Sequence, residues 1–239
     1  MGPLRGLAWA GGVALGLALG CGGELQIDDP ARIALERELE QERASHEDEA
    51  LRQFGLAGIY RKHGLHDSAI VSYARSVAAR PDFAEAYFFL ADLYYSRGKV
   101  EEAVGAYKQA IKVRPGFADA YNNLGFIYKK GGDLDRAEEV YREALVHDPG
   151  FAQGHNNLGQ IHKARGDSEG AEAAFLKALE LDAGLEQAYV NLASVYRDGR
   201  RRGDEFRLWG EYLQRFGTSS IYASYAAERL AALETPAAP

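Results

Sequence analysis

The sequence predicts an all-α fold in which similar helical hairpins stack side by side. Proline recurs at intervals of 34 residues, at Pro81, Pro115 and Pro149, and the residues between the prolines repeat in the same register. Within each period the apolar residues follow the spacing of an α-helix, and a glycine stands near the middle. These three observations indicate two short helices per period, joined by a tight turn.

The first helix of each predicted hairpin has one buried face. In the third period, Tyr121, Leu124, Gly125 and Tyr128 are spaced i, i+3, i+4 and i+7, which places them on one side of a helix. Small residues recur at the eighth position of the period and, in the second helix, at the twentieth, so that the two helices can approach closely. One hairpin cannot bury both of its faces, and stacking of the hairpins is therefore expected.

The turn inside each hairpin calls for a left-handed backbone conformation, which glycine adopts without strain. Asp133 and Asp167 follow two of these turns and are suited to cap the second helix, and the prolines end it. The glycines at the turn position are Gly64, Gly98, Gly132 and Gly166.

The fifth period departs from this pattern. Its twentieth residue is Glu205 and its twenty-seventh is Tyr212, where the earlier periods have small residues. Its turn reads Gly199-Arg200-Arg201-Arg202-Gly203. We therefore expect looser packing in this period, followed by a last amphipathic helix that closes the array.

The register resembles that of the tetratricopeptide repeat (TPR) family over about 170 residues. The resemblance implies a right-handed α-solenoid of about five TPR hairpins with a C-terminal capping helix, which binds proteins and is not an enzyme. The expected units are residues 50–83, 84–117, 118–151, 152–185 and, irregular, 186–219, followed by the capping helix at 220–234 and a disordered tail at 235–239.

Residues 1–20 have the layout of a secretory signal peptide: one basic residue, then an uncharged apolar run that ends in small residues. The sequence Leu17-Ala18-Leu19-Gly20-Cys21 resembles the lipobox of bacterial lipoproteins. The resemblance implies cleavage before Cys21 and acylation of its sulfur, so that the mature protein is anchored to a membrane by lipid. An ordinary cleaved signal or an uncleaved anchor is the alternative.

The residues after the cysteine refine this expectation. Gly22 is not the aspartate that retains many such lipoproteins at the inner membrane, so the resemblance implies an outer-membrane lipoprotein that faces the periplasm. Residues 21–49 are acidic and partly helix-prone. They are expected to form either a linker with a leading helix or a solvated charged segment.

Composition disfavours several classes of function. The chain has 28 basic and 35 acidic residues, a net charge of -7, which opposes binding to nucleic acid. A single cysteine allows no internal disulfide and no multi-cysteine zinc site. His155 and His162 share a helix face, but they stand in aromatic positions of the repeat, so packing is a better interpretation than metal binding. No cofactor or catalytic motif is indicated.

The candidate binding residues follow from the family resemblance. In the family the first helices line a concave groove, and the sixth residue of each faces inward. Here that position holds Asn123, Asn157 and Asn191. A row of amides can pair with the backbone of an extended peptide, because each offers a donor and an acceptor. The alternative is that these asparagines are solvated consensus residues.

Other groove positions carry aromatic and basic residues. Phe88, Phe89 and Phe126 are candidates for an apolar anchor site, although Phe88 is also suited to packing between hairpins. Lys129 and Lys163 lie at or near the groove edge by the same resemblance and favour an acidic partner, unless they belong to a solvated charged face.

Two functional hypotheses remain open at this level. The first is a membrane-tethered scaffold that binds a peptide or a partner protein in its concave groove. The second is a structural assembly factor for a pilus, a secretion channel or another cell-envelope complex, which uses its convex face or its C-terminal units. An enzyme is the third class, disfavoured because the sequence lacks site chemistry.

Overall fold

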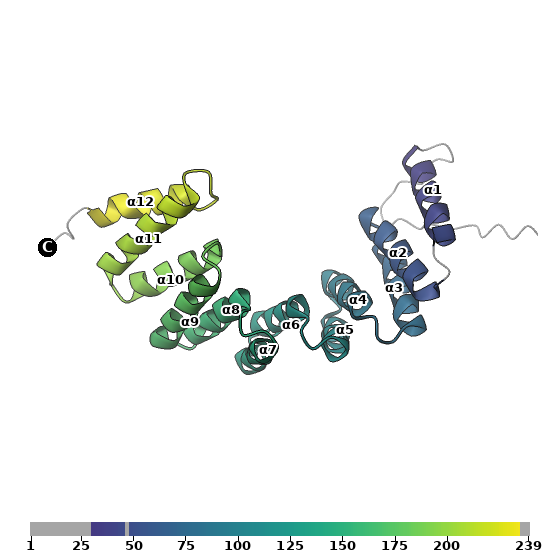
Figure 1. Cartoon of the computed structure of the whole chain (residues 1–239), viewed down its shortest axis with the longest axis horizontal. Coiled ribbons are helices and arrows are strands. Elements are labelled where there is room, and N and C mark those ends of the chain that lie inside the picture. The colour runs from purple at the N-terminus through teal and green to yellow at the C-terminus, as the bar shows by residue number, and fades with distance from the viewer. Residues whose placement is uncertain (1–29, 46–47, 235–239) are drawn as a thin grey trace, which may run out of the picture.

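The computed structural model describes residues 30–45 and 48–234, and these residues form twelve α-helices and no strand. Each helix packs against the next along the chain, and together they make an open crescent (Figure 1). The predicted all-α solenoid is therefore confirmed.

An inner row of five helices lines the concave side of the crescent (Figure 1). The inner helices are α2 (Glu49–Lys62), α4 (Ala84–Ser96), α6 (Ala118–Lys130), α8 (Ala152–Ala164) and α10 (Glu186–Asp198).

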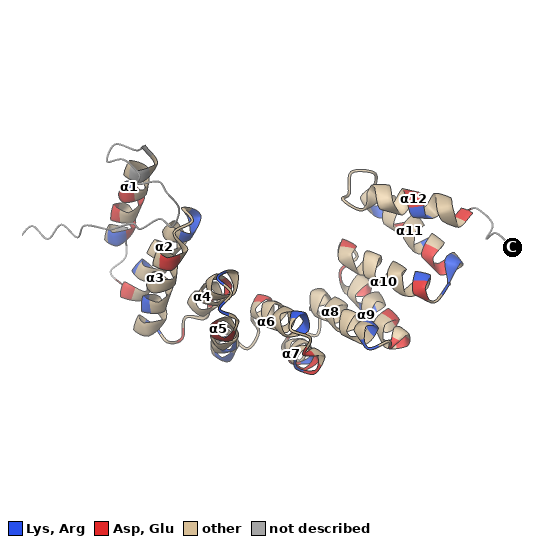
Figure 2. Cartoon of the chain, turned by 180° about the vertical axis from the view of Figure 1, so that it is seen from behind, with Lys and Arg blue, Asp and Glu red and all other residues tan. Residues whose placement is uncertain are grey.

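Each inner helix is followed by a partner on the outer, convex side. The outer helices are α3 (His66–Ala79), α5 (Val100–Val113), α7 (Leu134–His147), α9 (Ser168–Leu181) and α11 (Arg202–Phe216). In Figure 2 the outer helix α7 carries several charged residues, whereas the inner helix α8 is mostly uncharged.

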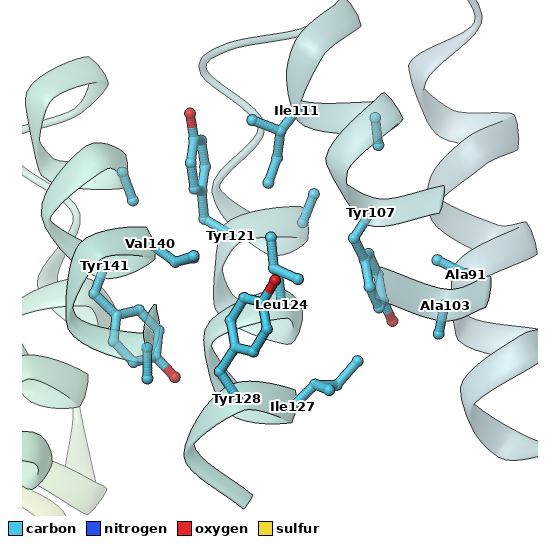
Figure 3. Close-up of a cluster of buried hydrophobic side chains, with 14 of the residues drawn as sticks. Ala91, Ala103, Tyr107, Ile111, Tyr121, Leu124, Ile127, Tyr128, Val140 and Tyr141 are labelled. Atoms are coloured by element: carbon cyan, nitrogen blue, oxygen red, sulfur yellow. The ribbon is translucent and has the colours of Figure 1, made fainter. Parts of the chain in front are cut away.

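The core of the central hairpins combines small residues with aromatic rings, and each helix contributes both kinds (Figure 3). Ala137 is fully buried, and Tyr141 is 1% exposed. A Cβ atom added to Gly125 would lie 2.5 Å from the Tyr141 ring, and one added to Gly159 would lie 2.6 Å from Phe175. Glycine at these two positions therefore sets how closely the helices of each hairpin approach.

The turns of the first four hairpins have the expected geometry. Gly132 and Gly166 have φ angles of 82° and 79°, and the equivalent glycines of the first two hairpins are similar. Asp133 accepts a hydrogen bond from the backbone N–H of Arg136 at 3.0 Å, and so caps α7. In the fifth hairpin the same turn position is Arg200, with a φ of 56°.

In the fifth hairpin the backbones of α10 and α11 approach each other less closely than do those of the other hairpins, although the side chains between them are buried. Bulky residues replace small ones between the helices, because Glu205 is 2% exposed and Tyr212 is fully buried. Helix α12 (Ala223–Glu234) supplies a partner for the buried Glu205. Its Arg229 forms hydrogen bonds of 2.9 and 3.1 Å to the Glu205 carboxylate.

A further helix, α1 (Pro30–Ser45), covers the N-terminal end of the array. Leu35 and Leu39 are buried in one cluster with Leu56 of α2, and Glu38 accepts a 3.0 Å hydrogen bond from Lys62. Part of the predicted linker is thus a helix that packs against the first hairpin.

The structure does not describe the two ends of the chain. The predicted signal peptide at 1–20, the lipidation site Cys21 and the tail at 235–239 all lie outside the described residues. Within the described part of the chain, no helix combines the length and the apolar character that crossing a membrane requires.

Candidate functional site

The concave face is defined by side chains that connect one inner helix with the next. Such connections join α4 with α6, α6 with α8 and α8 with α10. The side chains that make these connections occupy the fifth, sixth, ninth and twelfth positions of the repeat. The candidate residues of the sequence analysis lie among these positions.

A ladder of asparagine amides runs along this face. The side-chain N–H of Asn157 donates a 2.7 Å hydrogen bond to the side-chain oxygen of Asn122, which lies on the preceding inner helix. Asn191 donates in the same way to Asn156 at 2.9 Å. The sixth residue of one repeat therefore binds the fifth residue of the repeat before it.

Asn123 has a different partner because the preceding repeat has Phe88 at the fifth position. Its N–H donates to Asp92 at 3.1 Å and to the Tyr107 hydroxyl at 3.2 Å. Burial raises the pKa of Asp92, although the hydrogen bonds from Tyr107 and Asn123 oppose this shift. Burial and the neighbouring Asp92 raise the pKa of Tyr107, so its hydroxyl stays protonated.

The three predicted asparagines are therefore already engaged within the protein. The oxygen of Asn157 accepts a hydrogen bond from Gln153, and that of Asn191 accepts one from Gln187, both at 3.2 Å. An amide nitrogen carries two hydrogens. Asn157 and Asn191 each use one of them in the ladder, whereas Asn123 uses both, for Asp92 and for Tyr107.

The structure adds Asn122 and Asn156 to this row, which the sequence analysis did not single out. The sequence feature that could have identified them is the pair of adjacent asparagines in each of two successive repeats. Asn156 is fully buried, and its side-chain nitrogen has no hydrogen-bond partner among the described residues.

The three candidate phenylalanines do not form one site. Phe88 packs between hairpins, with its ring 5.0 Å from Phe117, and it also contacts Phe89 at 5.4 Å. Phe126 lies one hairpin further along and is 42% exposed, and its ring contacts Tyr95 of α4 at 6.3 Å. Of these three phenylalanines, Phe126 alone is exposed, whereas Phe88 and Phe89 are partly buried.

The two candidate lysines occupy equivalent positions, the twelfth of their repeats. Lys129 donates a hydrogen bond to the Gln160 amide oxygen of the next inner helix, and burial lowers its pKa. Lys163 donates to the Ser194 hydroxyl at 2.5 Å and lies 3.2 Å from the Asp198 carboxylate. Each ammonium is thus held against the ninth residue of the following repeat.

The two histidines contact different partners. His162 lies 2.8 Å from the Asp167 carboxylate, and His155 lies 3.2 Å from the Pro149 carbonyl oxygen. No group of three potential metal-ligating side chains occurs within residues that the structure describes.

Comparison with family models places known repeats on the central hairpins. A model described as TPR repeat matches residues 91–132, and two described as tetratricopeptide repeat match residues 118–151 and 152–184. No curated protein sequence matches the chain.

Several solved structures have a similar fold. MamA is 27% identical, with a TM-score of 0.55 over 67% of this chain and 96% of its own. YrrB, whose structure is described as a TPR protein with an unusual peptide-binding site, is 16% identical, with a TM-score of 0.57 over 80% of this chain and 97% of its own. PilF of Pseudomonas aeruginosa is 18% identical, with a TM-score of 0.62 over 78% of this chain and 89% of its own. At these identities, the likeness to YrrB and PilF shows the fold alone.

Proposed function

Because the chain is a tetratricopeptide repeat protein, we propose that it is a non-enzymatic scaffold that holds an extended segment of a partner protein on its concave face. The role of a protein-interaction scaffold fits the repeat family and the structural neighbours.

The amide ladder is the observation that carries this proposal. Asn157 and Asn191 are held at fixed positions one repeat apart, by hydrogen bonds of 2.7 and 2.9 Å. A row of fixed amides can bind the backbone of an extended segment whatever its side chains are, because a backbone presents alternating N–H and C=O groups. Their orientation is set before binding, which lowers the entropic cost of association.

The test places a photo-crosslinker on each side of the crescent. The photoreactive residue p-benzoylphenylalanine replaces Phe126 on the concave face in one variant and Val146 of α7 in a matched control. Val146 is 77% exposed and makes no part of the ladder. Both variants are irradiated in cells, and the crosslinked segments are identified by mass spectrometry.

We expect the Phe126 variant to capture one recurring segment of one protein, and the Val146 variant to capture none. Capture from position 146 alone would contradict binding on the concave face.

A second candidate function is an assembly factor that uses the convex face or the C-terminal units. A cleft of about 450 Å³ lies on the outer side between α5 and α7, lined among others by Lys108, Lys112 and Arg136. At the C-terminal end, Ile221 is 83% exposed beside the irregular fifth hairpin. The same crosslinker at Ile221 tests this candidate, which requires that this variant captures the recurring segment.

The membrane anchor belongs to the proposal as well. We propose that Cys21 carries the lipid and that the array faces the periplasm from the outer membrane, on the evidence of the lipobox-like sequence alone. Fractionation of cells that express the Cys21→Ala variant tests it. We expect the variant to leave the membrane fraction, and unchanged fractionation together with unchanged incorporation of labelled palmitate would contradict lipidation.

A further inference from the structure

Basic side chains gather in one row on the concave face of a chain that is acidic overall. The sequence has 35 acidic and 28 basic residues. Nevertheless, the twelfth position of four of the five inner helices is basic, and the remaining one is Tyr95. The four basic residues at this position are Arg61, Lys129, Lys163 and Arg197.

Most of this positive charge has no carboxylate at ion-pair distance. In the described part of the chain, Lys163 is the only member of the row with such a partner, Asp198 at 3.2 Å. Arg197 donates to the hydroxyl of Tyr225 at 2.7 Å, and Arg61 lies over the ring of Phe89 at 4.7 Å. Most basic side chains of this row therefore contact neutral groups of the protein and not carboxylates.

Lys129 shows this most clearly. Its ammonium is half-buried and its hydrogen-bond acceptor is the neutral amide of Gln160. Burial lowers its pKa, and the structure places no opposite charge there to offset the effect. A carboxylate from a ligand would restore favourable solvation of this charge through a charge-assisted hydrogen bond.

An exposed aromatic ring adjoins the same ammonium. Phe126 is 42% exposed, and the nitrogens of Lys129 and Lys130 lie 6.0 and 5.9 Å from its ring centre. An apolar side chain of a ligand can pack on this ring beside an acidic one.

We infer that the segment bound on the concave face is acidic, with carboxylates that pair with Lys129 and Lys163 and an apolar residue that packs on Phe126. This inference rests on the proposed function. Helices α6 and α8 are in contact, so their axes lie about 8–10 Å apart. An extended chain advances about 3.3 Å per residue, so the two carboxylates should stand about three residues apart.

The experiment selects ligands without assuming their sequence. A library of random twelve-residue peptides displayed on phage is panned against the purified array. Enriched peptides are then synthesised, and their affinities are measured for the wild type, for Lys129→Gln/Lys163→Gln and for Lys108→Gln/Lys112→Gln. The last variant removes the same charge from the outer helix α5, and circular dichroism verifies that both variants are folded.

We expect enriched peptides with acidic residues about three apart, which bind Lys129→Gln/Lys163→Gln about tenfold or more weaker than the wild type and the α5 variant. Enriched peptides without acidic residues, or equal losses in the two variants, would overturn the inference and leave the proposed peptide binding intact. Absence of any enrichment would count against both.

Discussion

Asn157 of α8 donates its side-chain N–H to the side-chain oxygen of Asn122 of α6, at 2.7 Å, across the boundary between two repeats. Asn157 is 4% exposed, so the bond is shielded from water. The residue thus connects neighbouring hairpins through this hydrogen bond.

We predict that Asn157→Ala lowers the free energy of unfolding by about 1–2 kcal/mol, because it removes the bond and leaves the oxygen of Asn122 with an unmet hydrogen bond. Urea unfolding followed by circular dichroism measures the change. Equal stability of Asn157→Ala and the wild type would contradict a connecting role. A loss of ligand affinity in this variant is interpretable only after this measurement.

Gly125→Ala is expected to destabilise the array. The added methyl group would lie 2.5 Å from the Tyr141 ring, which is 1% exposed and has no free space to move into. Overpacking of this kind costs about 1–3 kcal/mol. Gly105→Ala in α5 is the matched control, because nothing lies within 4 Å of its added atom. Alanine should raise stability there by about 0.8–1 kcal/mol through its helix propensity. If both substitutions changed the stability in the same direction, the close approach of Tyr141 to Gly125 would not determine the effect of Gly125→Ala.

Arg200→Gly is expected to stabilise the fifth hairpin. Arg200 has a φ of 56°, where the four preceding hairpins have glycine, and the left-handed conformation costs an L-residue about 1–2 kcal/mol. Part of that gain is lost to the greater freedom of glycine in the unfolded chain, so the net increase should be about 0.5–1 kcal/mol. Thermal unfolding measures it.

The reverse substitution supplies the control. Gly166 has a φ of 79°, and nothing lies within 4 Å of an added Cβ, so Gly166→Ala tests backbone strain alone. It should be destabilising. An unfolding temperature that falls in Arg200→Gly would indicate that the Arg200 side chain has contacts worth more than the strain.

The sequence was sufficient for the hairpins because their determinants are local and periodic. The small residue at Gly125, the turn glycines and the cap at Asp133 recur at fixed spacing, and the structure places each as expected. The contacts that shape the candidate site depend on stacking instead. Asn122 and Asn157 are 35 residues apart, one more than the period, so only the offset of neighbouring helices brings them together.

The groove aromatics illustrate the same limit. Phe88 and Phe126 occupy different positions of their repeats, the fifth and the ninth, and only the packing of each hairpin determines which ring is exposed. The pairing of Glu205 with Arg229 also escapes a periodic pattern, because α12 is not part of a repeat.

Arg229→Ala should destabilise the C-terminal end strongly. Glu205 is 2% exposed and accepts hydrogen bonds from Arg229 at 2.9 and 3.1 Å, so the substitution leaves a buried carboxylate without its counter-charge. Removing one partner of such a pair costs about 3 kcal/mol or more. In a Glu205→Gln background the same substitution should cost much less, since no charge is left behind. Urea unfolding of the four variants gives the coupling energy, and equal costs in the two backgrounds would exclude an electrostatic role.

Asp92→Asn is expected to raise stability at neutral pH. Burial raises the pKa of Asp92 in the folded protein, despite hydrogen bonds from Tyr107 and Asn123 and the charge of Arg61. A carboxyl group with a raised folded pKa contributes stability that is fully present below its unfolded pKa and is lost as the pH rises through the folded value.

Asparagine keeps an oxygen that accepts a hydrogen bond from Tyr107 but does not ionise. The difference in unfolding free energy between the variant and the wild type should therefore be small near about pH 3 and grow towards about pH 7. Asp82→Asn, at an exposed turn residue, is the control for a simple change in net charge. A difference that shrinks as the pH rises would mean that the Asp92 carboxylate is stabilised by its neighbours rather than penalised by burial.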